Sequence, residues 1–242
     1  MLNVRDHDVE DYTTLRHMDK TDVGVLSADD RVCIDEIGRY LVEAGAADRF
    51  ALWLLHKHFE PNQGEVFVER FFTAPRRTET TLVARAAYEA NGLHATAFRF
   101  DGSATSEAGL GVIGMEFAEA DDFGPTPPLC ADDETVLAGV AERLAAHGKT
   151  ERFGVKLIRD PLDLLERELL LETSDSTLRT LYCEVSSRDA LRAEESRIIE
   201  TSWRYEVVDG LGETIVMREC ISLCVREVDG GHESNHRHHA GG

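Results

Sequence analysis

Two histidines, His56 and His58, have the residue type and spacing best suited to chemistry. They end an apolar stretch, residues 50–59, that we interpret as a buried strand. Residues i and i+2 of a strand share a face and lie roughly 6.6 Å apart along it. Neutral imidazole binds zinc, copper, nickel and non-haem iron. The pattern therefore predicts a site for one of these divalent transition metals. The alternative is that both rings hydrogen-bond to neighbours or lie in solvent.

Further metal ligands are expected from the C-terminal part of the chain. Residues 230–242 hold four of the ten histidines, and histidine-rich tracts bind divalent metals by composition alone. This segment is typical of a flexible tail. The sharper hypothesis is that His232, His236 or His238 folds back to complete the site that His56 and His58 begin.

Cys224 is the remaining candidate ligand. If residues 214–225 form a strand, Cys220 and Cys224 lie about 13 Å apart. Both cannot then bind one zinc ion, whose bonds to sulfur are about 2.3 Å long. At most one of them joins a metal site. The alternative is that both are small buried residues on one face of a sheet.

The chain repeats itself at a fixed offset of 103 residues, for example from Asp30 to Asp133. In the second copy, Arg159 and Pro161 stand where the first has His56 and His58. We interpret the pattern as an internal duplication. The identical pairs are Asp29/Asp132, Asp30/Asp133, Leu41/Leu144, Gly45/Gly148, Arg49/Arg152, Phe50/Phe153, Leu54/Leu157, Glu65/Glu168, Glu69/Glu172 and Arg76/Arg179.

Glu65 and Glu69 follow the histidines and are candidates for a carboxylate beside them. Their counterparts, Glu168 and Glu172, recur in the half that lacks the histidines. That recurrence favours a structural role for all four, such as ion pairs with the recurring arginines Arg49 and Arg152.

The elements that must position these residues indicate an α+β protein. Each half has one main helix at 3.6-residue spacing, then strands and a closing hairpin. We expect a largely antiparallel sheet, with two main helices and the halves related by a pseudo-two-fold axis. The expected parts are residues 1–120 as the first half, 121–131 as a linker, 132–229 as the second half and 230–242 as the tail.

Composition excludes several classes of partner. The formal net charge of −20 argues against binding to nucleic acids and anionic membranes. No run reaches the ~18–20 apolar residues of a membrane span. Five cysteines, an odd number, suit a reducing compartment, so we expect a cytoplasmic protein. The glycines of residues 109–114 are followed by a strand pattern and a linker, not by the helix of a dinucleotide site.

The sequence therefore predicts a cytoplasmic metal-binding protein and leaves open whether it is a metalloenzyme. A small molecule remains an acceptable partner, and no pattern indicates an oligomeric state. The alternative function is a non-catalytic scaffold or interaction protein, built from the two halves and without a metal site.

Overall fold

The computed structural model describes residues 2–18, 23, 25–89, 92–101, 110–124, 126–159, 162–191, 198–210 and 213–225. Its strands are β1 (Asn3–Asp6), β2 (Phe50–Leu54), β3 (Glu65–Thr73), β4 (Arg76–Ala84), β5 (Leu93–Phe100), β6 (Gly111–Glu119), β7 (Phe153–Leu157), β8 (Glu168–Asp175), β9 (Thr180–Ser187), β10 (Ile198–Gly210) and β11 (Glu213–Val225). Its α-helices are α1 (Val9–Thr13), α2 (Ala28–Glu43), α3 (Glu134–Ala146) and α4 (Arg188–Leu191). Single 3₁₀ turns lie at Arg85–Ala87, Ala120–Asp122 and Ala131–Asp133.

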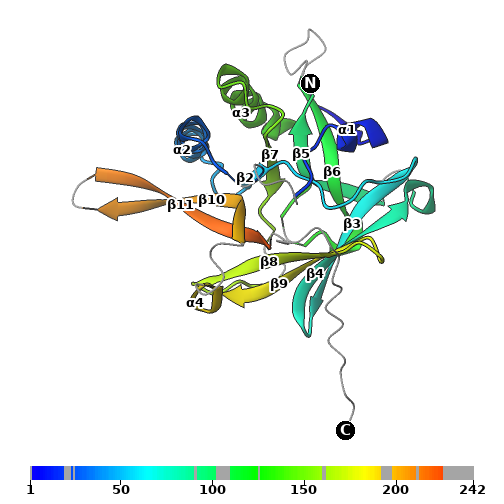
Figure 1. Cartoon of the computed structure of the whole chain (residues 1–242). Coiled ribbons are helices and arrows are strands. Elements are labelled where there is room, and N and C mark those ends of the chain that lie inside the picture. Colours follow the sequence, from blue (N-terminus) through cyan, green and yellow to red (C-terminus); the bar gives the residue numbers. More distant parts are fainter. Residues whose placement is uncertain are drawn as a thin grey trace.

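The sheet closes into a barrel of ten strands, in the order β6-β3-β4-β9-β8-β11-β10-β2-β7-β5 (Figure 1). The closing contact is β5, which pairs with β6 on one edge and with β7 on the other. The short β1 adds to β6 in parallel. The expected α+β fold with a largely open antiparallel sheet is therefore wrong. Apolar alternation shows which face of a strand is buried, but it does not show which edges pair, and closure removes the exposed edges.

The barrel order has a two-fold relation. If β2 and β7, β3 and β8, β4 and β9, β5 and β10, and β6 and β11 exchange names, every strand of the closed barrel keeps the same kind of neighbours. The parallel pair β3–β6 then corresponds to the parallel pair β8–β11. Strands from different halves pair with each other at β2–β7 and at β4–β9. Each half therefore supplies walls to the same interior. Residues of β2, β3 and β4 occupy places equivalent to those of the residues 103 positions later, in β7, β8 and β9.

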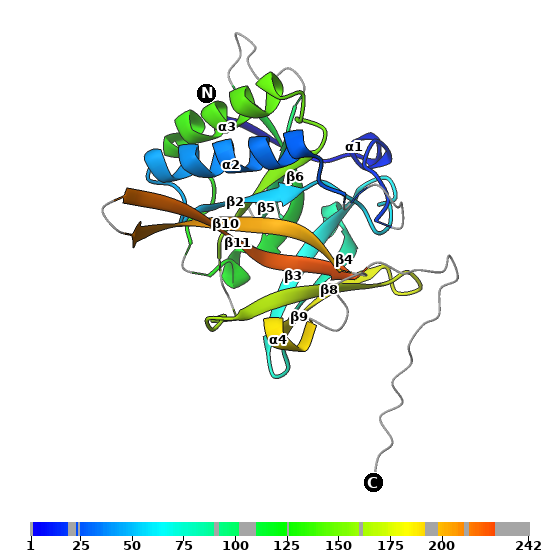
Figure 2. The same cartoon turned by 60° about the vertical axis from the view of Figure 1, so that its left-hand side comes forward.

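The two long helices lie side by side against the outer face of the barrel (Figure 2). Helix α2 starts with a capping box in which Ser27 and Asp30 hydrogen-bond to each other's backbone amides. Its buried face packs on outward-pointing residues such as Phe50 and Leu52 of β2. No helix in the described residues is long and apolar enough to cross a membrane.

The inward-pointing face of the barrel strands lines the interior, and it includes charged side chains. Glu116 of β6, Lys156 of β7 and Glu172 of β8 line two cavities in common. One cavity, of about 30 Å³, adjoins His56 and His58. The other, of about 120 Å³, extends along the interior towards Arg159. Charges in a barrel interior need partners, and these pairings decide where the candidate site lies.

Candidate metal centre

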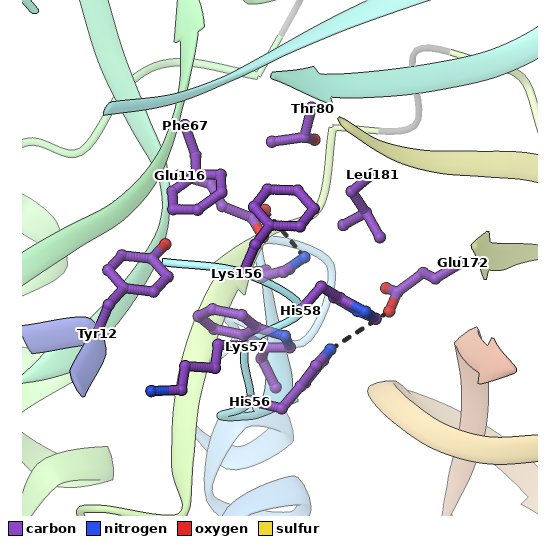
Figure 3. A pocket seen from close by; sticks show the side chains of 12 residues that line it. Tyr12, His56, Lys57, His58, Phe67, Thr80, Glu116, Lys156, Glu172 and Leu181 are labelled. Carbon is purple, nitrogen blue, oxygen red and sulfur yellow. Dashed lines mark ion pairs between the residues drawn. The ribbon is translucent and has the colours of Figure 1, made fainter. Parts of the chain in front are cut away.

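Four side chains of ligand type converge at one end of the barrel interior. They are His56, His58, Glu172 and Cys224, and their ligand atoms all lie within 4.8 Å of one another. The histidines follow β2, whereas Glu172 belongs to β8 and Cys224 to β11, where the parallel register places them opposite each other. His56, His58 and Glu172 point towards one another in Figure 3. The cluster could hold a metal ion, and it joins the two halves of the chain.

The histidines do not meet through strand geometry, as the sequence interpretation assumed. Strand β2 ends at Leu54 rather than continuing to residue 59. The backbone of Lys57 instead pairs with the N-terminal segment, donating to the Arg16 carbonyl and accepting from the Met18 amide, both at 2.9 Å. This pairing ends the barrel strand and turns the chain. The two imidazole rings still meet, with their centroids 5.1 Å apart.

Hydrogen bonds fix the imidazole of His56. Its Nδ1 lies 2.7 Å from the carbonyl oxygen of Leu54, so Nδ1 carries the proton and donates it. The other nitrogen, Nε2, then faces Glu172 Oε2 at 3.6 Å. His56 is 5% exposed, so it is shielded from bulk solvent. A backbone carbonyl that orients a histidine in this way is usual behind a metal-binding imidazole.

One carboxylate oxygen of Glu172 accepts a hydrogen bond from the described residues, and the other does not. Oε1 accepts a short hydrogen bond from Ser222 Oγ. Oε2 is buried and has no hydrogen-bond partner among the described residues. A buried carboxylate oxygen without a partner is costly, and such a group calls for an explanation. A cation between the ligand atoms would supply the missing interaction.

Two of the distances between ligand atoms, and all four donor types, suit a tetrahedral ion. Bonds of about 2.0–2.3 Å from zinc to nitrogen, oxygen and sulfur place neighbouring ligand atoms roughly 3.3–3.8 Å apart. His56 Nε2 lies 3.6 Å from Glu172 Oε2, and His58 Nε2 lies 3.3 Å from Cys224 Sγ. Two imidazoles, one carboxylate and one thiol are all zinc ligands.

Burial and nearby charges shift the pKa values of three of the four ligands, and not all in the same direction. Burial, with the nearby His56, lowers the pKa of His58 to about 3, so this ring is neutral. Burial acts to raise the pKa of Glu172, but the close approach of His56 and the charge of Lys156 outweigh it, and the pKa lies below its usual range. Burial and the Glu172 charge raise the pKa of Cys224 well above its usual value. Glu172 is thus ionised, whereas Cys224 is a thiol that must lose a proton to bind a cation.

The candidate residues from the sequence fall into two groups. The structure brings His56, His58 and Cys224 together. His232, His236 and His238 lie outside the described residues. Cys220 is buried on β11, where its thiol faces the Ser222 carbonyl oxygen at 3.1 Å.

Glu172 is the residue that sequence reasoning missed, because it was assigned to ion pairs with the recurring arginines. The arginines named for these pairs are wrong, because Arg49 pairs with Asp133, at 2.5 Å, and Arg152 pairs with Asp30, at 3.2 Å. Glu65 and Glu168 do have a structural role, since they pair with Arg179 and Arg76. Glu172 lies 103 positions after Glu69, just as Arg159 lies 103 positions after His56. The repeat relates these residues but does not by itself show that they meet.

The equivalent place in the other half of the barrel holds an ion pair. Arg159, the counterpart of His56, makes a short ion pair with Glu69, the counterpart of Glu172. Ala118 stands opposite Glu69 in the β3–β6 register, as Cys224 stands opposite Glu172 in β8–β11. Each glutamate therefore meets a side chain that lies two residues after a strand of the other half, β2 for Glu172 and β7 for Glu69. One place holds an arginine ion pair. The other brings His56 Nε2 to 3.6 Å from Glu172 Oε2, beside His58 and Cys224.

Comparison with known proteins finds no matching family model, no matching curated protein and no matching solved structure. The chemistry of the cluster is thus the ground on which a function is proposed for this chain.

Proposed function

We propose that the chain binds one divalent transition-metal ion, zinc before iron, nickel or copper, at the end of the barrel interior. The ligands are His56 Nε2, His58 Nε2, Glu172 Oε2 and Cys224 Sγ. The observation that carries the proposal is the buried Oε2 of Glu172, which accepts no hydrogen bond from the described residues and lies among three other ligand atoms. Zinc is placed first because a mixed set of nitrogen, oxygen and sulfur ligands in a tetrahedral arrangement suits it.

The bound ion would connect parts of the chain that are far apart in sequence. His56 and His58 belong to the segment after β2, and the other two ligands belong to β8 and β11. The ion would therefore hold the segment after β2 against strands of the second half. The alternative function is a scaffold without a metal site. Such a protein would have the same fold but would not bind a metal ion stoichiometrically.

The direct test is the metal content of protein purified without an affinity tag, compared with that of the double variant His56→Ala/His58→Ala. We expect about one ion per chain in the first and none in the second. A chain that ends at Gly230 should keep its ion, because the four proposed ligands precede the histidine-rich segment. Loss of the metal only on this truncation, or no metal in any form, would contradict the proposal.

Zinc affinity should depend on pH because Cys224 has a raised pKa. Its thiol must release a proton when the ion binds, and each proton released favours binding as pH rises. We expect the apparent association constant to increase by at least about tenfold per pH unit between about pH 6 and pH 8. Competition with a chelating dye at each pH measures it. The variant Cys224→Ser, which lacks the thiol, should bind more weakly and with a smaller slope, whereas equal slopes would count against Cys224 as a ligand.

A further inference from the structure

A water-sized space adjoins the proposed metal ligands. The cavity of about 30 Å³ is lined by His56, His58 and Glu172 on one side. A water molecule needs roughly 10–15 Å³ by this measure, so the space suits about two waters. Tyr12, Phe67 and Leu181 form apolar walls around it. The space has room for a species of two or three heavy atoms and for nothing as large as a metabolite.

Trp53 lines this space and carries a hydrogen-bond donor without a partner in the part of the chain that the structure describes. The side chain lines the cavity, is 3% exposed, and has a buried Nε1 without a hydrogen-bond partner among the described residues. Its ring meets that of His56 edge-on, with centroids 6.1 Å apart. The other tryptophan, Trp203, is satisfied, because its Nε1 donates to Glu200 at 3.1 Å. An indole N–H can only donate, so the missing partner of Trp53 is an acceptor.

A charged pair completes the surroundings. Lys156 Nζ lies 3.0 Å from Glu116 Oε2 and 4.8 Å from the centre of the Trp53 ring, and both residues line the same cavity (Figure 3). Buried waters typically make about three hydrogen bonds to polar groups. A water here would find Trp53 as donor, Glu116 as acceptor and the metal ion as its third partner.

We propose that the metal ion carries a further, exchangeable ligand in this space, held by Trp53 Nε1. The resting ligand is a water molecule, and a small anion of two or three heavy atoms replaces it. This inference rests on the proposed metal site and extends it, because four protein ligands alone describe a closed structural site. Zinc and cobalt both accept such a fifth ligand, and catalytic zinc sites differ from structural ones in keeping a position open.

The test uses the full chain loaded with one equivalent of Co²⁺, with sodium azide as the probe. Thiolate-to-cobalt absorption first reports that the ion lies beside Cys224. Azide should then change the visible cobalt spectrum in a saturable way. Trp53→Phe should keep the cobalt and weaken azide binding about tenfold, the loss of one hydrogen bond. Trp203→Phe is the matched control, because it removes an indole that does not line the space and already donates to Glu200, and it should leave the azide affinity unchanged.

The outcomes separate this inference from the proposed function. Cobalt bound through thiolate with no response to azide would overturn the open position and leave the metal site intact. No cobalt bound at one equivalent would overturn the metal site itself. Equal azide affinity in wild type and Trp53→Phe would remove Trp53 from the role. If Trp53→Phe does not fold, the azide titration of the wild-type protein still decides whether the position exists.

Discussion

Zinc should raise the free energy of unfolding of the metal-free protein by about 2.7 kcal/mol at a free zinc concentration about 100 times Kd, and by about 4.1 kcal/mol at about 1,000 times Kd. The physical reason is that the four ligands meet only in the folded barrel, so zinc binds the folded state and not the unfolded chain. Denaturant unfolding in zinc-buffered solutions, with and without chelator, measures the increment.

Two glutamates at equivalent places in the barrel provide the control. Glu172→Gln removes the carboxylate that faces His56 and should abolish the zinc increment. Glu69→Gln removes the carboxylate of the ion pair with Arg159, and this variant should keep the full increment even though its own stability is lower. Equal increments in the two variants would show that the stabilising ion binds elsewhere.

Three of the four residues in the cluster could be nominated from the sequence. His56 and His58 stand out because the second copy of the repeat has Arg159 and Pro161 in their places. Residues present in only one copy are not required by the fold that both copies share. Cys224 was named as a candidate, but the length of its strand excluded only a zinc site shared with Cys220 and did not choose between the two cysteines. The geometric reason given for the histidines was wrong, since β2 ends before them and the N-terminal segment turns the chain.

Glu172 and the closed barrel could not be reached, for one common reason. Apolar periodicity shows which face of a strand is buried, and identical residues show which strand is its repeat, but neither shows which strands pair with it. In this barrel each half contributes strands to both sides of the interior. Glu172 looked structural because it recurs as Glu69. Only the pairing of β8 with β11 and the approach of the segment after β2 give the two copies different partners. The same residue type thus has two roles, set by what the other half places beside it.

The ion pair between Arg159 and Glu69 should prove structural. Arg159 is 8% exposed, and the side chain of Glu69 is 20% exposed, so Arg159→Met leaves a largely buried carboxylate without its cation. Breaking a buried pair from one side costs about 3–5 kcal/mol, and the partial exposure of Glu69 places the expected loss at about 3 kcal/mol. Denaturant unfolding of the metal-free protein measures this loss.

The double variant Arg159→Met/Glu69→Gln isolates the cause. Without the stranded charge, it should recover a large part of the stability that Arg159→Met loses, since an uncharged amide is cheaper to bury than a carboxylate. Zinc content should stay at about one ion per chain in both variants, because neither residue belongs to the cluster. Loss of zinc in Arg159→Met alone would mean that the two places are coupled through the charges between them, Lys156 and Glu116, and that the ion pair belongs to the metal site after all.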